Sequence, residues 1–346
     1  MPRPASPRVS AILGAVWQLL LLGCLALALR YAWIHETTDP VRLAGAPPHA
    51  FTVRPGQSAA AVAEGLSFIG LVKRPAQFRA LVFVRGDGAR LQAGDYLFDG
   101  TLSLQDIVDK LVRGDVARYD VTFPEGKTLE EMADLAASKG VDRAAFLKAA
   151  RDPEPIRGLD PDAKDLEGYL FPDTYDVGAK PEAARLVARM LGRFRAVVLP
   201  LRPRLLERNL GIRQLVTLAS IVELETGRAE ERPRIAAVFL NRLAKGMLLQ
   251  TDPTVIYALR QKGTWDGNIR KADLQLDSPY NTYRVIGLPP GPIASPGRDA
   301  LLAVLEPAAT QDLYFVSRND GSHEFSDNLA AHERAVTRFQ RRRGGA

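Results

Sequence analysis

The chain has 346 residues, enough for about two domains, and its 46% hydrophobic and 25% charged residues are typical of globular proteins. These values exclude a largely disordered chain, a collagen-like chain and a polytopic membrane protein. The formal net charge of +6 is concentrated at the two ends, with three arginines in residues 1–30 and four in residues 338–343. Because the part between them is nearly neutral, we expect no nucleic-acid partner.

Cysteine and histidine usage argues against a metal centre. The single cysteine, Cys24, cannot form an intramolecular disulfide or a cysteine-ligated zinc site. The four histidines do not form an HExxH pattern, and the nucleophile-elbow, phosphate-loop and dinucleotide-binding glycine motifs are missing.

An apolar segment near the N-terminus is predicted to cross a membrane. The run from Ala11 to Leu29 carries no charge and is just long enough for a bilayer core. Arg3 and Arg8 precede it, so the positive-inside rule places the N-terminus in the cytoplasm and the body in the periplasm or outside. We therefore expect a single-pass anchor in the inner (cytoplasmic) membrane. It would comprise a cytoplasmic tail (1–10), a transmembrane helix (11–30) and a linker rich in Pro and Gly (31–48).

Two other interpretations of this segment stay open. Ala26-Leu27-Ala28 is similar to a signal-peptidase site, which would release the protein. The residues before Cys24 are similar to a lipoprotein cleavage box. The membrane anchor and both of these alternatives place the rest of the chain outside the cytoplasm.

A strand–turn–helix pattern occurs three times. Phe51 to Ser58 predicts a strand, a glycine turn and an N-cap before an apolar helix. The pattern returns at Val121–Thr128, where Thr128 and Glu131 form a capping box, and more weakly at Gly100–Ser103. The unit resembles LysM modules, which bind the glycan of cell walls, and a generic α+β spacer is the alternative.

The predicted fold class is α+β, with a small strand–helix domain followed by a helix-rich domain with short β elements. A segment rich in Pro and Asp, residues 152–165, indicates a domain boundary. We expect a LysM-like domain (49–120), a second strand–helix subdomain (121–152) and a catalytic domain (153–346). In the last, helices are predicted near 181–196, 212–226, 230–244 and 329–343, with a hairpin turn at 319–321.

The helix predicted at 212–226 carries a candidate general acid. Glu223 and Glu225 lie two residues apart and so point about 200° apart, which prevents both from facing one substrate atom. Glu225 lies at the flank of the apolar stripe and in the last turn before Gly227. Apolar neighbours and the negative end of the helix dipole both raise the pKa of a carboxyl, as a general acid at neutral pH requires. The alternative is that both are solvated glutamates.

Two segments further along the chain predict the binding surface. Asp252 before Pro253 is a good helix N-cap, and a catalytic role is the alternative. The segment Ser278–Gly297 holds five prolines and a cluster of Tyr, Asn and Thr, typical of a binding loop, with a rigid surface loop as the alternative. His323 and His332 are further groove candidates, with structural or surface roles as the alternative.

Five motifs in chain order carry a family resemblance. They are LEGYLFPDTY (166–175), LASIVELETG (218–227), VFLNRL to TDPTVIY (238–257), SPYNTYRVIGLPPGPIASPGRDAL (278–301) and LYFVS to HEFSDNLAAH (313–332). Together they resemble the YceG-like endolytic murein transglycosylases, over about residues 50–340.

The resemblance implies a lytic transglycosylase, a carbon–oxygen lyase of cell-wall biogenesis. Such enzymes cut the β-1,4 bond between MurNAc and GlcNAc without water and leave 1,6-anhydroMurNAc ends. Related enzymes carry Arg-Gln-Glu-Ser at the catalytic glutamate, so Glu225, followed by the hydroxyl of Thr226, is the implied acid. Leu224 stands where the family more often has Lys. No cofactor is implied.

Polar and aromatic residues that cluster near these motifs suggest the surroundings of the acid. Glu223 and Glu167 are candidate supporting acids. The residues expected to bind substrate are Tyr169, Gln250, Thr251, Tyr280, Asn281, Thr282 and Tyr283. Peptidoglycan strands and the membrane are the expected partners, and peptidoglycan synthases are a further possibility. A non-enzymatic wall-binding scaffold and a lysozyme-like hydrolase are the alternatives.

Overall fold

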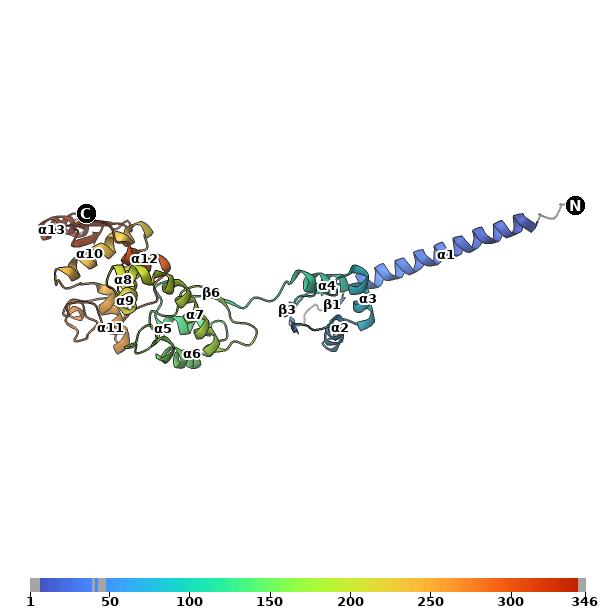
Figure 1. Cartoon of the computed structure of the whole chain (residues 1–346), viewed down its shortest axis with the longest axis horizontal. Coiled ribbons are helices and arrows are strands. Elements are labelled where there is room, and N and C mark those ends of the chain that lie inside the picture. The colour runs from blue at the N-terminus through green and yellow to red at the C-terminus, as the bar shows by residue number, and fades with distance from the viewer. Residues whose placement is uncertain (1–6, 39–40, 43–47, 342–346) are drawn as a thin grey trace. The chain divides into compact units, whose positions relative to one another are not determined.

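The computed structural model describes residues 7–38, 41–42 and 48–341 and shows a helix-rich α+β chain (Figure 1). The chain divides into two compact parts, which we call unit 1 (up to Arg118) and unit 2 (from Tyr119). Each unit has its own hydrophobic core.

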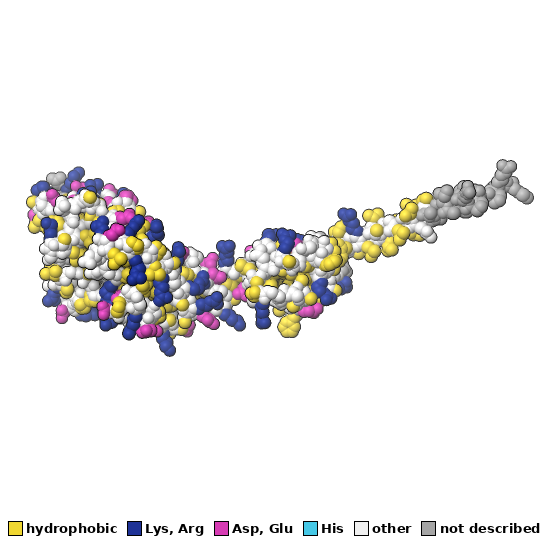
Figure 2. Space-filling view, in the orientation of Figure 1, with side chains coloured by type: hydrophobic (Ala, Val, Ile, Leu, Met, Phe, Trp, Pro, Cys, Tyr) yellow, Lys and Arg dark blue, Asp and Glu magenta, His cyan; other side chains and the backbone are white. Residues whose placement is uncertain are grey.

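The N-terminal helix α1 (Pro7–Thr38) is longer than predicted. Its segment Val16–His35 is long and apolar enough to cross a membrane, and hydrophobic side chains cover it (Figure 2). The prediction of a linker from residue 31 is wrong, because no glycine or proline interrupts the helix before Pro40. Predicted tail residues 1–6 and linker residues 39–40 and 43–47 lie outside the described part.

The end of α1 is built into unit 1. Trp33 packs against the unit 1 core, and the buried Thr37 accepts a hydrogen bond from Gln105 (3.3 Å). β1 (Val41–Arg42), which begins three residues after the end of α1, pairs with β4 (Thr101–Leu102). Trp33, Thr37 and the strand Val41–Arg42 therefore contribute to a folded unit where a linker was expected.

Unit 1 packs three helices against a small antiparallel sheet. β2 (His49–Val53) pairs with β3 (Gly94–Phe98), and Ser58 caps the following helix by accepting from the Ala61 N–H (3.2 Å). The strand, turn and helix predicted from Phe51 are confirmed as local structure. The helices are α2 (Ala59–Phe68), α3 (Pro75–Arg85), which was not predicted, and α4 (Leu104–Arg113).

Unit 2 begins with the segment predicted to be a separate subdomain. β5 (Asp120–Thr122) pairs antiparallel with β6 (Thr174–Asp176), across the expected boundary near residue 152. Phe123 and Phe146 belong to the same core as Phe194 and Phe239. The Pro- and Asp-rich segment does not separate two domains, because its Ile156 is buried in that core. The first helices are α5 (Leu129–Ala137), α6 (Arg143–Ala150) and the short η1 (Glu154–Ile156).

The helix α9 (Ile212–Glu225) is buried from Leu215 to Val222 and packs against three later helices, α10, α11 and α12 (Figure 1). The helices and turns of this part are α7 (Ala183–Val198), η2 (Leu199–Leu201), α8 (Arg202–Glu207), α9 (Ile212–Glu225), η3 (Ala229–Glu231), α10 (Arg232–Ala244), α11 (Asp252–Lys262), η4 (Asp273–Gln275) and α12 (Arg298–Leu305). The chain ends in the hairpin β7 (Tyr314–Ser317) and β8 (His323–Ser326), followed by α13 (Leu329–Val336) and η5 (Thr337–Arg341). The predicted helices and hairpin of this part are confirmed to within a few residues, and residues 342–343 of the last one lie outside the described part.

Candidate active site

Glu225 is the last residue of α9 and is held by the start of the neighbouring helix. Thr226 is extended, so the chain leaves the helix directly after the glutamate. The Thr251 hydroxyl, next to α11, donates a hydrogen bond to Glu225 Oε1. The carboxyl is therefore oriented by a residue from a distant part of the sequence.

The surroundings of Glu225 favour its protonated form. Burial raises the pKa of Glu225 to about 7, and the negative charge of Asp252 acts in the same direction. The hydrogen bond from Thr251 and the charges of His323 and Arg242 lower the pKa and offset part of this shift. At neutral pH the carboxyl is close to half protonated, so it can donate and accept a proton.

A cluster of threonines fixes the residue that holds Glu225. Thr251 N–H donates to Thr282 Oγ1 (3.1 Å), and the Thr282 hydroxyl lies 2.9 Å from that of Thr254. The Gln250 N–H donates to the Thr282 carbonyl (3.1 Å). Thr251 and Thr282 are both buried, so they position the acid, whereas the Gln250 side chain is exposed.

The predicted N-cap of α11 is displaced by one residue. Thr251 is the N-cap and Asp252 the first helical residue, with no side-chain capping bond. The reason is that both side chains have other partners: Thr251 donates to Glu225, and Asp252 accepts a hydrogen bond from the Tyr283 hydroxyl (2.6 Å). Tyr283 is thereby fixed beside the acid.

Two further side chains act on Glu225 from α10 and β8. Arg242 donates to the carbonyls of Leu249 (2.9 Å) and Leu313 (2.6 Å). His323 lies with its Nδ1 2.6 Å from Glu231, whose other carboxylate oxygen accepts the His323 N–H. The sequence analysis missed Arg242 and Glu231. The available signal for Arg242 was an arginine within the apolar pattern VFLNRL.

The two candidate supporting acids lie elsewhere. Glu223 forms an ion pair with Arg232 (2.7 Å) and accepts the Gly297 N–H (2.9 Å), so it points away from Glu225, as helix geometry requires. Glu167 is buried and accepts the Leu129 N–H (3.1 Å) at the start of α5. Burial raises the pKa of Glu167 to about 8.

Two predicted substrate-binding residues are enclosed by protein. Tyr169 is 1% exposed and donates a hydrogen bond to Asp160 in the core. Asn281 is 0% exposed and donates to the carbonyls of Leu274 (3.0 Å) and Leu276 (2.8 Å), which shapes the loop. Neither is placed to contact a glycan. Tyr280 is half-buried and packs on the Tyr257 ring, with the ring centroids 5.0 Å apart.

The second half of the predicted binding loop is a buried strap. Residues 291–297 are all buried, and the Ile293 N–H donates to the Ser220 hydroxyl of α9 (3.1 Å). Pro292 packs so closely on Gly168 that a side chain at residue 168 would meet it at 2.4 Å, and Gly168 has a φ of +80°. This part of the loop fixes α9, and the exposed residues of the loop all lie before residue 291.

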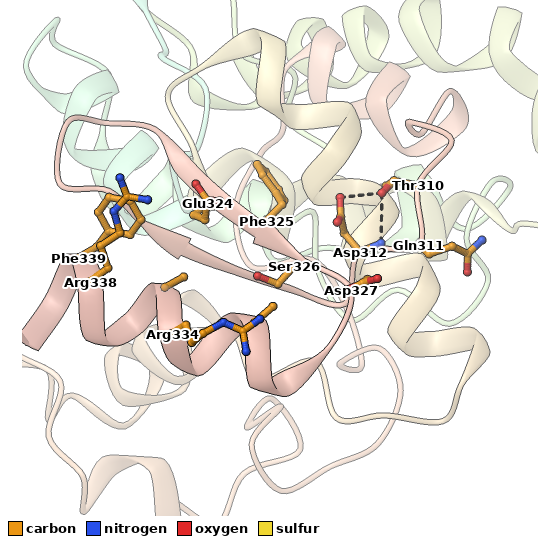
Figure 3. A pocket seen from close by; sticks show the side chains of 12 residues that line it. Thr310, Gln311, Asp312, Glu324, Phe325, Ser326, Asp327, Arg334, Arg338 and Phe339 are labelled. Atoms are coloured by element: carbon orange, nitrogen blue, oxygen red, sulfur yellow. Dashed lines mark hydrogen bonds between the residues drawn. The ribbon is translucent and has the colours of Figure 1, made fainter.

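A groove of about 490 Å³ lies against the C-terminal hairpin, between β8 and α13 (Figure 3). Phe325, Arg334 and Arg338 line it, and Glu225 is not among its lining residues. Its acid Asp312 is paired with Arg234 (2.6 Å). Of the predicted groove histidines, His332 stacks on Tyr314 (ring centroids 5.1 Å apart), and burial lowers its pKa.

The site has the features of general acid–base catalysis. An enclosed carboxyl with a pKa near neutral is held by one hydroxyl in a helix-rich unit. Within the described residues, no group of three His, Cys, Asp or Glu side chains could hold a metal ion.

The sequence matches the model of the YceG-like family over residues 51–338, and the chain belongs to this family. Glu225 and its neighbours from α10, α11 and β8 all lie within the matched region.

Named relatives are similar over most of the chain. The endolytic murein transglycosylase of Bacillus subtilis is 32% identical, with 82% of each chain covered. That of Streptococcus pneumoniae serotype 2 is 31% identical over 71% of this chain, and the match spans half the length of that relative. The crystal structure of a yceG-like protein from Listeria monocytogenes superposes with a TM-score of 0.58 at 31% identity, covering 84% of this chain and 99% of that one.

Proposed function

We propose that the protein is an endolytic lytic transglycosylase that cleaves the β-1,4 MurNAc–GlcNAc bond of peptidoglycan and leaves 1,6-anhydroMurNAc ends. The observation that carries this proposal is Glu225, an enclosed acid with a pKa of about 7 at the end of the buried helix α9. The curated relatives named endolytic murein transglycosylase support the same reaction.

The reaction requires one group that first donates and then accepts a proton. Glu225 protonates the glycosidic oxygen, the C1–O bond breaks, and its electron pair leaves with the GlcNAc hydroxyl. The MurNAc ring develops oxocarbenium character. The C6 hydroxyl then attacks C1 and returns its proton to the Glu225 carboxylate, so no water is consumed and the acid is regenerated.

A hydrolase would normally use a second carboxylate beside the scissile bond. Among the described residues, Asp252 is the acid with an electrostatic effect on Glu225, and it is bound by the Tyr283 hydroxyl. Glu223 forms an ion pair with Arg232, and Glu167 accepts a hydrogen bond from the N-terminus of α5. This arrangement favours the single-acid mechanism.

The glycan would lie along the surface next to Glu225. Gln250, Tyr280 and Tyr283 are the predicted contacts with solvent access, and Thr251 and Thr282 would act by holding the acid. Tyrosine rings offer flat faces to sugars and a hydroxyl for hydrogen bonds.

The helix α1 would anchor the enzyme with its N-terminus in the cytoplasm and both units outside. Unit 1 would act as the LysM-like, glycan-facing module next to the membrane. In that position the enzyme would reach nascent strands and limit their length, with peptidoglycan synthases as partners. Support for this comes from the length and hydropathy of Val16–His35 and from the way α1 enters unit 1.

The proposal is tested by mass spectrometry of purified peptidoglycan digested with the full chain in detergent. We expect anhydro-ended fragments from the parent protein and none from Glu225→Gln. Glu223→Gln on the same helix is the matched control and should retain products. Reducing ends in place of anhydro ends would indicate a hydrolase, and binding without products would indicate a scaffold.

A further inference from the structure

Arg242 is a buried cation without a carboxylate partner. Its side chain belongs to a residue that is 8% exposed, in the middle of unit 2. Its hydrogen bonds go to the carbonyls of Leu248 (3.1 Å), Leu249 (2.9 Å) and Leu313 (2.6 Å) and to the side-chain oxygen of Gln250 (3.4 Å). It lies 5.0 Å from the centre of the Tyr314 ring. Within the described part of the chain, no carboxylate lies within ion-pair distance of it.

This arrangement is unusual, because a buried charge is costly unless an opposite charge compensates for it. The buried Arg232 and the partly buried Arg213 follow the rule: Arg232 pairs with Glu223, and Arg213 pairs with Asp160. Burial lowers the pKa of the Arg242 guanidinium, because the charged form is less stable away from water. The guanidinium nevertheless stays charged.

The segments that Arg242 holds are those that build the site. Leu248–Gln250 leads directly to Thr251, whose hydroxyl contacts Glu225, and Leu313 leads into β7, the partner strand of His323. The charge of Arg242 lowers the pKa of Glu225 and that of Tyr283.

The groups that act on Glu225 can be named element by element. Thr251 and Asp252 act from α11, Tyr283 from the loop, His323 from β8 and Arg242 from α10. Around Arg242 itself lie Tyr314, Tyr283 and His332, and Glu225 is the carboxyl that acts on it.

We propose that Arg242 is a positioning residue that stabilises the Glu225 carboxylate formed when the acid has protonated the leaving glycosidic oxygen. The proposal rests on the function proposed above. Glu225 reacts in its protonated form, and in that form the guanidinium lacks a counter-charge. The first proton transfer creates that counter-charge, so the guanidinium stabilises the carboxylate that this transfer leaves behind. A fixed cation in a site of low dielectric does this without rearranging.

The test is the pH dependence of kcat and kcat/KM for glycan cleavage by the full chain in detergent. Glu225 must be protonated at the start, so activity falls as pH rises through its pKa, near 7. Arg242→Gln removes a charge that lowers this pKa. We therefore expect the alkaline limb of the pH–activity profile to move to higher pH by about one unit. We expect kcat to fall about 10- to 100-fold, with KM changed little.

Two matched variants separate charge from structure. Arg242→Lys keeps the charge and should keep the limb near that of the parent, with most of kcat retained. Asn241→Ala removes the neighbouring carbonyl contacts of α10, to Thr310 and Asp312 (both 3.0 Å), without changing charge. This variant should leave the limb in place, even if the melting temperature drops.

The proposal would be overturned if the alkaline limb of the pH profile of Arg242→Gln stays in place or moves to lower pH. The same upward shift of the limb in Asn241→Ala would also overturn it. So would an equal loss of kcat in Arg242→Lys and Arg242→Gln. If Arg242→Gln has no measurable activity, an active Arg242→Lys supports the charge and an inactive one refutes it. Failure of the proposed function is seen separately, as anhydro products from Glu225→Gln.

Discussion

Three carboxyl groups of α9 and its neighbourhood show how environment assigns different roles to the same chemistry. Glu225 is enclosed beside a hydroxyl, Glu223 is paired with an arginine, and Glu167 accepts the N–H of a helix start. Only the first combines a pKa near 7 with neighbours from several elements that can tune it. The two-residue spacing in the sequence predicts that Glu223 and Glu225 point in different directions. It does not predict the environment of Glu167.

Changing Asp252 should move the pH profile in the direction opposite to Arg242→Gln. Asp252 raises the pKa of Glu225, so Asp252→Asn should shift the alkaline limb of kcat/KM to lower pH, by about half a pH unit. The amide oxygen can still accept the Tyr283 hydrogen bond, which limits structural change. A limb that moves to higher pH would contradict the assignment of Asp252 as a neighbour of the acid.

The raised pKa of Glu167 predicts how the stability of the protein depends on pH. Its folded value of about 8 lies above the ordinary value near 4.5, so the folded state keeps a proton that the unfolded state loses. Stability should therefore fall as pH rises from about 4.5 to about 8, by at most about 1.4 kcal/mol per pH unit. Glu225 contributes the same sign up to about pH 7.

Glu167→Gln removes this titration and should flatten the decline in the free energy of unfolding of unit 2 between pH 5 and pH 8. The measurement is urea unfolding at both pH values, with Glu225→Gln as the second variant. An unchanged slope in Glu167→Gln would show that Glu167 is ionised in the folded protein.

At the scale of elements, the strap of residues 291–297 fixes α9 through backbone hydrogen bonds. Its backbone donates to Ser220 and Glu223 of α9, and the Ser295 N–H donates to the Lys127 carbonyl (2.9 Å) before α5. A segment without helix or strand periodicity is thus one of the best-buried parts of unit 2.

Ser220→Ala tests the strap. It leaves the buried Ile293 N–H without its acceptor, and we expect a loss of about 1–3 kcal/mol in the stability of unit 2. For a unit of this size that corresponds to a fall of about 2–4 °C in Tm per kcal/mol. Ser138→Ala, which removes an exposed hydroxyl on α5, is the control. Equal Tm values for the two variants would mean that the strap does not depend on this bond.

At the scale of the whole molecule, the two cores make the units separable. The chain between α4 and β5 has no regular structure, and Arg118 within it is exposed. We expect trypsin to cut after Arg118 first and to leave a stable fragment that starts at Tyr119, detected by mass spectrometry and by a retained thermal transition. Early cleavage within 121–165 would contradict the single core of unit 2.

The distribution of charge agrees with an uncharged polymer backbone as substrate. On the face shown in Figure 2, basic and acidic side chains are interspersed over unit 2, and hydrophobic ones follow α1. A polyanion would favour a surface of one sign.

The sequence by itself determined the features that depend on near neighbours in the chain. The apolar run predicts the long helix, the 3.6-residue period predicts α9 with Glu225 on its flank, and the Asn-Asp-Gly turn predicts the hairpin. The order of the motifs was enough to indicate the family.

Only the tertiary structure decided which side chains meet. Asn281 and Tyr169 have the chemistry of sugar-binding residues, yet their partners in the fold bury them. The apolar pattern around Arg242 is a weak local signal and Glu231 has none, because the importance of both comes from α10, β8 and the loop before α11 converging on Glu225. Periodicity records which face of a helix is apolar, whereas long-range packing determines what lies against that face and therefore which carboxyl becomes the acid.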